Sequence, residues 1–420
     1  MLYQRWRRVA RQFHRVPALR EPGTGRAWTF EQLAAEVEAA PKPDGPLAFP
    51  QGHSAEFVLT VLRAWRFGQA VCPLEAGHAR PTVGQLPPGI CLLKTTSATT
   101  GRPRFVAFTA EQLAADADNI VATMGLRPDW PNLGVISLAH SYGFSNLVTP
   151  LLLHGIPLTV ASATLPEALR RAAATGTDWT LPAVPALWRA WHEAGAIPAH
   201  VRLAISAGAP LPLSLEQAVF EKSGLKIHNF LGATECGGIA YDATSTPRPD
   251  TSLAGAPLRN VHLSQAEDGC LVVRGANVGE TYWPQPDTRL VGGTFYTSDL
   301  VDLRDNGVFV RGRASDLINV AGRKVSPESI EQALLTHPAV RECLVVGVPG
   351  GAEERADVIA AVVGLREPAS TDDLKSFLHG RLPAWQVPRE WRFVDSLSVN
   401  QRGKLSRTEW RRIFTDRQPA

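Results

Sequence analysis

The sequence feature that most constrains the fold is an alternation of short apolar segments with longer amphipathic ones. The strands and helices that this alternation predicts are, in chain order, residues 45–49, 54–68, 69–74, 201–206, 213–224 and 226–232. A strand, a helix and a second strand at this spacing predict a parallel sheet with helices packed against it. A further helix is expected at 29–40, because Thr29 and Gln32 have the spacing of a capping box.

The pattern changes near Leu263 and again after Arg313. Residues 263–310 contain short strands separated by turns, which predict a small antiparallel, barrel-like unit. From residue 314 onward, alternating helices and strands predict a separate α+β domain. We therefore expect an α/β fold. Its large N-terminal domain (residues 1–313) has doubly wound sheets and the barrel-like unit, and its small C-terminal domain (residues 314–420) is the α+β unit.

The composition indicates an ordinary globular protein. Apolar residues make up 44% and charged residues 20% of the 420 residues, a balance that is not typical of disorder. The formal net charge of +3 is too small to indicate nucleic acid or an anionic membrane as the main partner. The five cysteines form no C-x-x-C pair, which argues against a zinc site and favours the cytoplasm. No apolar run reaches the roughly 20 residues needed to cross a bilayer.

The N-terminal segment, MLYQRWRRVARQFHRVPALR, is rich in arginine and lacks acidic residues. Leu2, Tyr3, Trp6, Val9 and Phe13 recur at helical spacing, with arginines on the opposite face. Such a helix can be a targeting or membrane-surface element. We favour the other interpretation, a surface helix packed on the first domain.

A loop of small hydroxyl residues follows the predicted strand 90–93. It reads TTSATTG from Thr95 to Gly101, and Arg102 and Arg104 come soon after. Backbone N–H groups and hydroxyls in such a loop can bind a polyphosphate, and the arginines balance its charge. The glycine spacing and the missing lysine exclude the loop of P-loop ATPases. A plain connector is the alternative for this segment alone.

Four further residues occupy positions that suit a nucleotide site. Glu235, in GATE after a strand, is a lone carboxylate that can hold Mg²⁺ beside a phosphate. Asp299 ends a strand, where it can accept hydrogen bonds from both hydroxyls of a ribose. Arg313 lies at the domain boundary, and Lys404 follows a glycine near the C-terminus. Each of the four, taken alone, is also compatible with an ordinary surface residue.

Together and in this order, these motifs resemble those of the adenylate-forming superfamily: acyl- and aryl-CoA ligases, peptide-synthetase adenylation domains and beetle luciferases. The family pattern has a T-S-G-T-T-G-x-P-K loop, a Y-G-x-T-E segment, a T-G-D, a G-R-x-D-D hinge followed by G-x-x-x-x-P-x-E-I-E, and a closing G-K. The counterparts here are residues 96–104, 231–235, 297–299, 312–316, 322–331 and 403–404. The resemblance covers nearly the whole chain.

The resemblance implies an enzyme that uses ATP, Mg²⁺ and coenzyme A, or the phosphopantetheine of a carrier protein. Glu235 would ligate Mg²⁺, and Thr234 would contact the α-phosphate. Lys404 would bridge the substrate carboxylate and the α-phosphate as acyl-AMP forms. The other residues implied in nucleotide binding are Thr96, Ser97, Thr99, Thr100, Gly101, Arg104, Gly208, Ala209, Pro210, Leu231, Gly232, Asp299, Arg313 and Gly322.

The resemblance also implies that the C-terminal domain changes its orientation between two steps. The domain would rotate about Ser315, which would remove Lys404 after adenylation and present the Gly322 loop for the thiol step.

The chain departs from the family pattern at five of these positions. Ala98 and Arg104 replace a glycine and a lysine of the phosphate loop, and these two changes bear on ATP affinity. Leu231 replaces the aromatic residue against adenine, and Ser298 and Ser315 replace a glycine and an aspartate. The stretch between the PLEAGH strand end and the loop is also short. We therefore expect part of the N-terminal sheet and its helices to be missing.

Residues 137–155 resemble the family segment that opens the acyl pocket. Within it, His140 is a candidate for catalysis and substrate binding, and Tyr142 and Gly143 are candidates for substrate binding. Phe144 is better explained as a core aromatic residue. The other substrate candidates are Gly208 and Gly232.

An aryl or acyl acid is favoured over an amino acid as the substrate. An amino acid needs an acidic residue to bind its ammonium group, and Leu138, Ala139 and His140 stand where peptide-synthetase domains carry one. The apolar stretch 181–188, LPAVPALW, agrees with this preference.

Alternatives to a CoA ligase remain open from the sequence. A stand-alone adenylation enzyme that loads an acyl or aryl carrier protein uses the same thiol arm. A non-catalytic binding or regulatory homologue is also conceivable, although Glu235 and Lys404 are both retained. A nicotinamide oxidoreductase lacks its G-x-G-x-x-G segment here. The expected partners are a small carboxylic acid, ATP and CoA, and the expected assembly is a monomer or homodimer.

Overall fold

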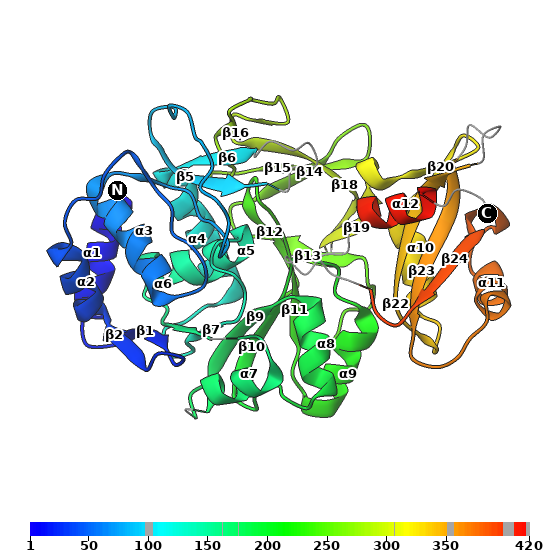
Figure 1. Ribbon diagram of the computed structural model, residues 1–420, viewed down its shortest axis with the longest axis horizontal. Helices are drawn as coiled ribbons and strands as arrows, with labels where there is room; N and C mark the ends of the chain where they lie inside the picture. The colour runs from blue at the N-terminus through cyan, green and yellow to red at the C-terminus, as the bar shows by residue number, and fades with distance from the viewer. Residues whose placement is uncertain are drawn as a thin grey trace.

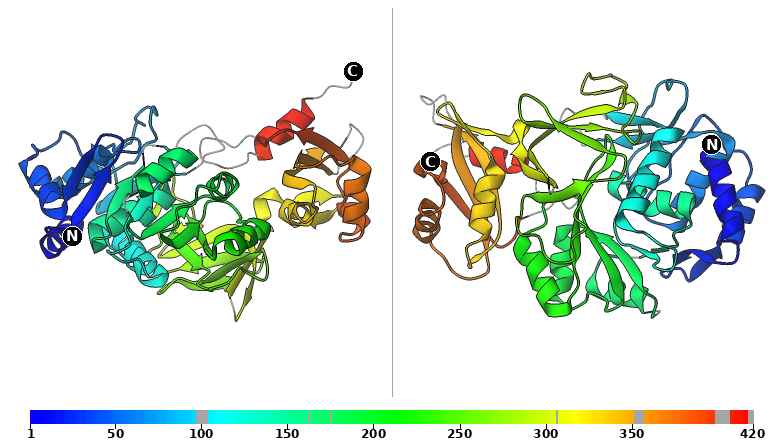
Figure 2. Two further views of the ribbon diagram at one scale, coloured as in Figure 1. Left: turned by 90° about the horizontal axis from the view of Figure 1, so that it is seen from below. Right: turned by 180° about the vertical axis from the view of Figure 1, so that it is seen from behind.

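The computed structural model describes residues 1–96, 104–161, 163–174, 176–305, 307–350, 357–397 and 407–416. A large N-terminal part and a smaller C-terminal domain, coloured from yellow through orange to red, lie side by side (Figure 1). Both further views separate the same two parts (Figure 2). The predicted site residues Ser97, Thr99, Thr100, Gly101 and Lys404 lie outside the described residues.

One long mixed sheet runs through the N-terminal domain. Its strands are β1 (Pro17–Glu21), β2 (Arg26–Thr29), β7 (Asn132–Gly134), β8 (Leu158–Val160), β9 (Trp179–Ala183), β10 (Val201–Ser206), β11 (Ile227–Ala233), β12 (Gly237–Tyr241), β13 (Leu253–Pro257), β14 (His262–Gln265), β15 (Cys270–Arg274), β17 (Leu290–Val291), β18 (Thr294–Arg304) and β19 (Gly307–Arg313). The strand order is β14-β15-β18-β19-β13-β12-β11-β10-β9-β7-β8-β1-β2, and β17 pairs with β18.

The direction of pairing divides this sheet into two parts. Strands β7 to β11 pair in parallel, as predicted from the alternating pattern. Strands β12 to β19 of this sheet pair antiparallel, as predicted for residues 263–310. The antiparallel strands continue the large sheet through β12 and β13 rather than forming a detached unit.

A second sheet contains β3 (Leu47–Ala48), β4 (Ala70–Val71), β5 (Ile90–Thr95), β6 (Phe105–Thr109) and β16 (Thr281–Trp283), in the order β16-β6-β5-β4-β3. The predicted helix α3 (Ala55–Phe67) joins the parallel strands β3 and β4 and ends at Gly68, whose φ is +71°. Strands β4 and β5 are also parallel, but residues 72–89 between them contain no helix. Instead, Val83 and Leu86 pack on the sheet face formed by Cys72, Leu93 and Phe105.

Helices cover both sheets and join them into one core. Besides α3, they are α1 (Leu2–Gln12), α2 (Phe30–Ala39), α4 (Ala110–Met124), α5 (Ser141–Gly143), the π-helix η1 (Phe144–Val148), α6 (Thr149–His154), α7 (Pro166–Ala173), α8 (Pro185–Glu193) and α9 (Leu213–Ser223). Helix α4 contacts β5 and β6 of the second sheet and β12 of the first. The predicted capping box at Thr29 and Gln32 is present, and an equivalent pair starts α4.

The N-terminal helix α1 packs on the first domain, which confirms the favoured interpretation. Leu2, Trp6, Val9 and Ala10 are buried in the main core. On its polar side, Arg5 Nε donates to the Leu153 carbonyl at 3.1 Å. Asp118 accepts from Arg5 Nη1 at 3.2 Å and lies 2.9 Å from His154 Nε2.

Acid is expected to loosen this attachment. Burial alone would raise the pKa of Asp118, but the hydrogen bonds from His154 and Arg5 outweigh it and lower the pKa to about 2. Because the folded pKa lies below the unfolded value of about 4, the contribution of Asp118 to stability is present above pH ~4 and is lost as the pH falls toward ~2. In urea unfolding, Asp118→Asn should therefore have a lower free energy of unfolding than wild type at neutral pH. This difference in free energy should vanish as the pH falls across this window. The exposed Asp305→Asn serves as the control, and a difference that persists at low pH contradicts the interpretation.

The C-terminal domain is an α+β unit, as predicted, built around a sheet with strand order β22-β23-β24. Its elements are the 3₁₀ turn η2 (Ala314–Asp316), β20 (Ile318–Val320), β21 (Arg323–Val325), α10 (Pro327–Leu335), β22 (Val340–Pro349), β23 (Asp357–Leu365), α11 (Thr371–His379), the 3₁₀ turn η3 (Ala384–Gln386), β24 (Glu390–Val394) and α12 (Arg407–Thr415). The apolar side chains of β22 and β23 enter two separate cores, one with α10 and α11 and the other with α12. Burial of both faces explains their nearly continuous apolar sequences.

No helix in the described part of the chain is long and apolar enough to span a membrane.

Candidate active site

The predicted nucleotide segments follow the carboxyl ends of neighbouring parallel strands. Gly208, Ala209 and Pro210 come after β10. Leu231 and Gly232 lie near the end of β11, which pairs with β10. His140 and Tyr142 follow β7, on the other side of β9. Because ligands of open α/β sheets bind outside this edge, the fold brings these predicted segments to one place.

Glu235 is held by a tyrosine that the sequence did not indicate. The buried Tyr282 of β16 donates a hydrogen bond from its hydroxyl to Glu235 Oε1 at 3.0 Å. Burial and the neighbouring Glu235 charge raise the pKa of Tyr282, so the phenol stays protonated and remains a donor. Oε2 of Glu235 has no hydrogen-bond partner among the described residues. One fixed carboxylate with a free oxygen fits Mg²⁺, which usually takes few protein ligands.

Arg104 lies beside the same tyrosine. Its guanidinium is 3.6 Å from the centre of the Tyr282 ring, and its Nη2 donates to Asp287 Oδ2 at 2.8 Å. The Arg104 carbonyl accepts from the backbone N–H of Thr96 at 2.9 Å and from its hydroxyl at 3.0 Å. Residues 96 and 104 therefore close the base of the predicted phosphate loop.

The two predicted ribose-binding residues face each other across β18 and β19. Asp299 and Arg313 are register partners, and Arg313 Nε donates to Asp299 Oδ1 at 2.9 Å. The charge of Asp299 raises the pKa of Arg313 further. The Asp299 side chain is only 13% exposed, whereas that of Arg313 is 55% exposed. The pair thus presents one oriented carboxylate at the domain boundary.

The candidate His140 is held by an acidic residue from a different part of the chain. Its Nε2 lies 3.1 Å from Glu75 Oε1, which also accepts from the Ser137 hydroxyl at 2.7 Å. Glu75 follows β4 and belongs to the PLEAGH segment, so only the tertiary structure shows its proximity to His140. The contact fixes one edge of the imidazole ring beside the acyl segment.

The rest of the acyl segment divides between wall and core. Tyr142 is half-buried, and its ring centre lies 5.9 Å from that of Phe230. Gly143 packs so closely that a Cβ would lie 1.9 Å from the Ser137 carbonyl oxygen. Phe144 is fully buried against Phe57, which confirms that it is a core residue.

Gly322 lies at the tip of the β20–β21 hairpin. Ala321 and Gly322 have φ values of +50° and +85°, the backbone that two-residue hairpin turns require. A groove of about 490 Å³ next to this tip is lined partly by Gly322, Trp385 and Arg389. The predicted hinge residue, Ser315, lies in the η2 turn and donates to Asp316 Oδ1 at 3.0 Å.

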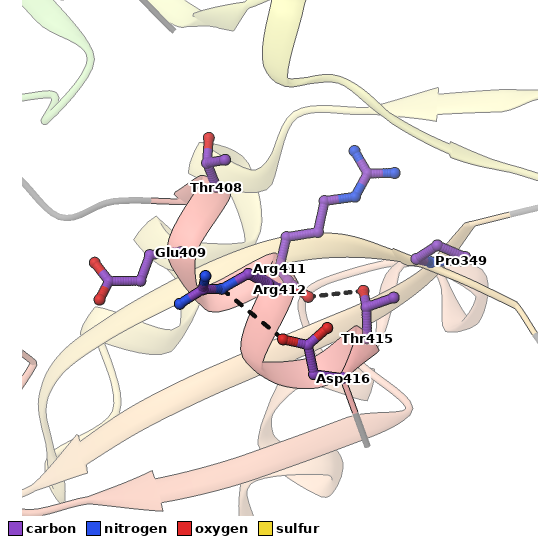
Figure 3. Close-up of a pocket in the computed structure, with 7 residues that line it drawn as sticks. All are labelled: Pro349, Thr408, Glu409, Arg411, Arg412, Thr415 and Asp416. Atoms are coloured by element: carbon purple, nitrogen blue, oxygen red, sulfur yellow. Dashed lines mark hydrogen bonds and ion pairs between the residues drawn. The ribbon is translucent and has the colours of Figure 1, made fainter. Parts of the chain in front are cut away.

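Another groove, of about 630 Å³, lies against α12 (Figure 3). Arg412 points toward Asp416 along its wall, and Pro349 comes from the end of β22 (Figure 3). The residues that line this groove include none of the predicted site residues.

A buried network of four charges, which no sequence motif indicated, holds the backbone directly after the Gly208–Pro210 segment. Glu216 contacts Lys226 and accepts from Arg248 Nε at 2.8 Å, and Lys226 Nζ is 2.5 Å from Asp242. Arg248 Nη2 donates to the Leu211 carbonyl at 2.7 Å. The network therefore ties the strand end that carries the predicted adenine wall to β11 and β12.

Two family models match the chain. The AMP-binding enzyme family matches residues 79–283, and the AMP-binding enzyme C-terminal domain matches residues 329–404. A 2-succinylbenzoate–CoA ligase of Geobacillus kaustophilus is 32% identical over 77% of this chain and 69% of its own. A feruloyl-CoA synthase of Amycolatopsis sp. is 29% identical over 81% of this chain and 73% of its own. A sulfoacetate–CoA ligase of Cupriavidus necator is 29% identical over 87% of this chain and 76% of its own.

Solved structures have the same fold. The o-succinylbenzoate CoA synthetase of Bacillus subtilis, in complex with its acyl-adenylate intermediate, superposes with a TM-score of 0.81 at 22% identity and covers 97% of both chains. ATP-bound MatB from Rhodopseudomonas palustris superposes with a TM-score of 0.83 at 21% identity, covering 97% of this chain and 98% of its own. The chain therefore belongs to the adenylate-forming superfamily of AMP-binding enzymes, as a member of the AMP-forming acid–CoA ligase class.

Proposed function

We propose that this enzyme activates an aryl or acyl carboxylic acid with ATP, forming an acyl-AMP and pyrophosphate, and then transfers the acyl group to the thiol of CoA. The observation that carries the proposal is the arrangement around Glu235. This carboxylate is fixed by Tyr282 at the base of the phosphate loop and lies on the same sheet edge as the acyl segment.

The residues divide the proposed work between them. Glu235 would hold Mg²⁺, which neutralises phosphate charge when it is bound. Asp299, oriented by Arg313, would accept hydrogen bonds from the ribose hydroxyls. His140, held by Glu75, would lie beside the substrate carboxylate. Lys404, outside the described residues, would place a cation between the carboxylate and the α-phosphate, two anions that otherwise repel each other.

The surroundings of the acyl segment favour an acid without an ammonium group. Leu138, which stands where an amino-acid site needs an acidic residue, is fully buried and apolar. The ring of Tyr142 packs beside Phe230, and Leu181 and Trp188 of the apolar stretch 181–188 are buried. The relatives named above act on feruloyl, succinylbenzoate and sulfoacetate acids, so both aryl and short acyl acids belong in a test.

Pyrophosphate release measured with aryl and acyl acids, ATP and Mg²⁺, with and without CoA, tests the proposal. We expect release that depends on the acid, a CoA thioester when CoA is present, and loss of both in Lys404→Ala. Release without thioester formation would assign the acyl group to a carrier-protein thiol instead. No release with any acid, while ATP still binds in calorimetry, would contradict the proposed aryl or acyl substrate.

A further inference from the structure

Lys94 is a buried cation at the base of the phosphate loop that the proposed chemistry does not use. It is the second-last residue of β5, and only 4% of its surface is exposed. Burial of an ammonium group costs several kcal/mol unless it is paired and hydrogen-bonded. Its contacts therefore have to explain why a lysine occupies this position.

The contacts of Lys94 lead into the acyl segment. Nζ is 3.2 Å from the hydroxyl oxygen of Ser141 and 3.1 Å from that of Ser145, and it lies 4.7 Å from the centre of the Phe108 ring. The charge is balanced by Asp116, which accepts from the Ser145 hydroxyl at 2.6 Å. Burial lowers the pKa of Lys94, and the nearby Asp116 opposes that effect.

The directions of these hydrogen bonds distinguish the two serines. An ammonium group only donates, so both hydroxyl oxygens accept from Lys94. The Ser145 hydroxyl donates its own hydrogen bond to Asp116. The second oxygen of Asp116 accepts from the Gly238 N–H at 3.0 Å. The Ser141 proton has no acceptor among the described residues.

Ser141 is also placed to meet a substrate. It is only half-buried, and it lies between the candidates His140 and Tyr142 at the start of α5. Because Lys94 occupies a lone pair of its oxygen, the Ser141 hydroxyl must point its proton elsewhere. The ammonium also polarises this hydroxyl and makes it a stronger donor.

We propose that Ser141, oriented by Lys94, is a hydrogen-bond donor that determines substrate specificity; this inference rests on the function proposed above. The acid then carries a second oxygen acceptor besides the carboxylate that is adenylated. A hydroxyl or carboxylate substituent accepts this hydrogen bond. An unsubstituted ring or chain leaves the donor unpaired, which sites built around a polar group discriminate against.

The test uses a scan of one aryl skeleton: benzoate, the three hydroxybenzoates and the three benzenedicarboxylates. For each acid, kcat/KM is measured by pyrophosphate release, and Kd is measured by calorimetry with AMP present. In wild type, a substituent at one ring position should improve on benzoate by about 10- to 100-fold, the worth of a hydrogen bond to a charge-assisted group. In Lys94→Met and Ser141→Ala this ratio should fall close to one, whereas the exposed Lys42→Met should preserve it.

The two measurements separate the inference from the function beneath it. Binding with the expected preference but without turnover counts against the proposed function and supports the inference. If no ring position gains tenfold in either measurement, the inference is wrong. It is also wrong if the ratio survives in Lys94→Met, or if Lys94→Met lowers kcat/KM of all acids equally. That last result would place Lys94 at the reacting carboxylate or in the scaffold. Thermal melting of each variant checks that it is folded.

Discussion

Replacing Glu216 with glutamine is expected to lower the free energy of unfolding by about 3–5 kcal/mol, the usual result of removing one member of a buried ion pair. Glu216 is fully buried, and it accepts from Arg248 through both the backbone N–H at 2.9 Å and Nε at 2.8 Å. It also contacts Lys226. Glutamine keeps the shape but leaves two buried cations opposite one carboxylate, Asp242.

The matched control is Glu221→Gln, on the exposed side of the same helix α9. A surface change of this kind should alter stability by no more than about 0.5 kcal/mol. Urea unfolding compares the two variants. If they lose the same stability, the network is not a stabilising unit. Because Arg248 also holds the Leu211 carbonyl, Glu216→Gln should raise the KM for ATP as well.

Glu235→Gln is expected to lower kcat/KM for ATP by about 100- to 1,000-fold, the size typical of losing one group that stabilises charge in a transition state. The amide can still accept from Tyr282 but no longer carries the charge that suits Mg²⁺. Tyr282→Phe keeps the charge and removes the hydrogen bond that orients it. Its expected effect is a metal affinity weakened by about 10- to 100-fold, as for other residues that orient a metal ligand.

Metal binding is measured directly, by calorimetric titration of Mg²⁺ with ATP analogue present, in addition to turnover. Tyr296→Phe is the control, because Tyr296 is 40% exposed on β18. Its affinity for Mg²⁺ should equal that of wild type. Equal affinity in Tyr282→Phe as well would show that Glu235 needs no support from the phenol.

Local signals predicted most of the fold. The cap at Thr29, the glycine that ends α3, and the strand–helix–strand spacing around α9 depend on neighbours in sequence, and the structure has each of them. The hairpin of β1 and β2 was not predicted, and neither was the parallel pairing of β1 with β8, which lies far along the chain. Helix α12 was missed because its buried Trp410 and Phe414 have meaning only against β22 and β23.

The site shows the same division. Glu235, Asp299 and Arg313 could be chosen as candidates from the sequence because each lies in a short motif with its own spacing. Tyr282 and Glu75 could not, because each reaches the site from a strand or loop that is distant in sequence. Lys94 is adjacent to a motif, yet its role depends on Ser141 and Ser145, which folding brings next to it.

The helix-free connection from β4 to β5 has a consequence for how this chain can change in evolution or by engineering. Residues 76–80 are exposed, and the strands on either side are already paired in parallel. Exposed backbone between fixed ends is where inserted sequence is best tolerated. A helical hairpin or a whole foreign domain grafted here would project into solvent, while Val83 and Leu86 stay packed on the sheet. The connection is thus an attachment point at which the scaffold can gain modules while the parallel pairing of β4 and β5 is kept.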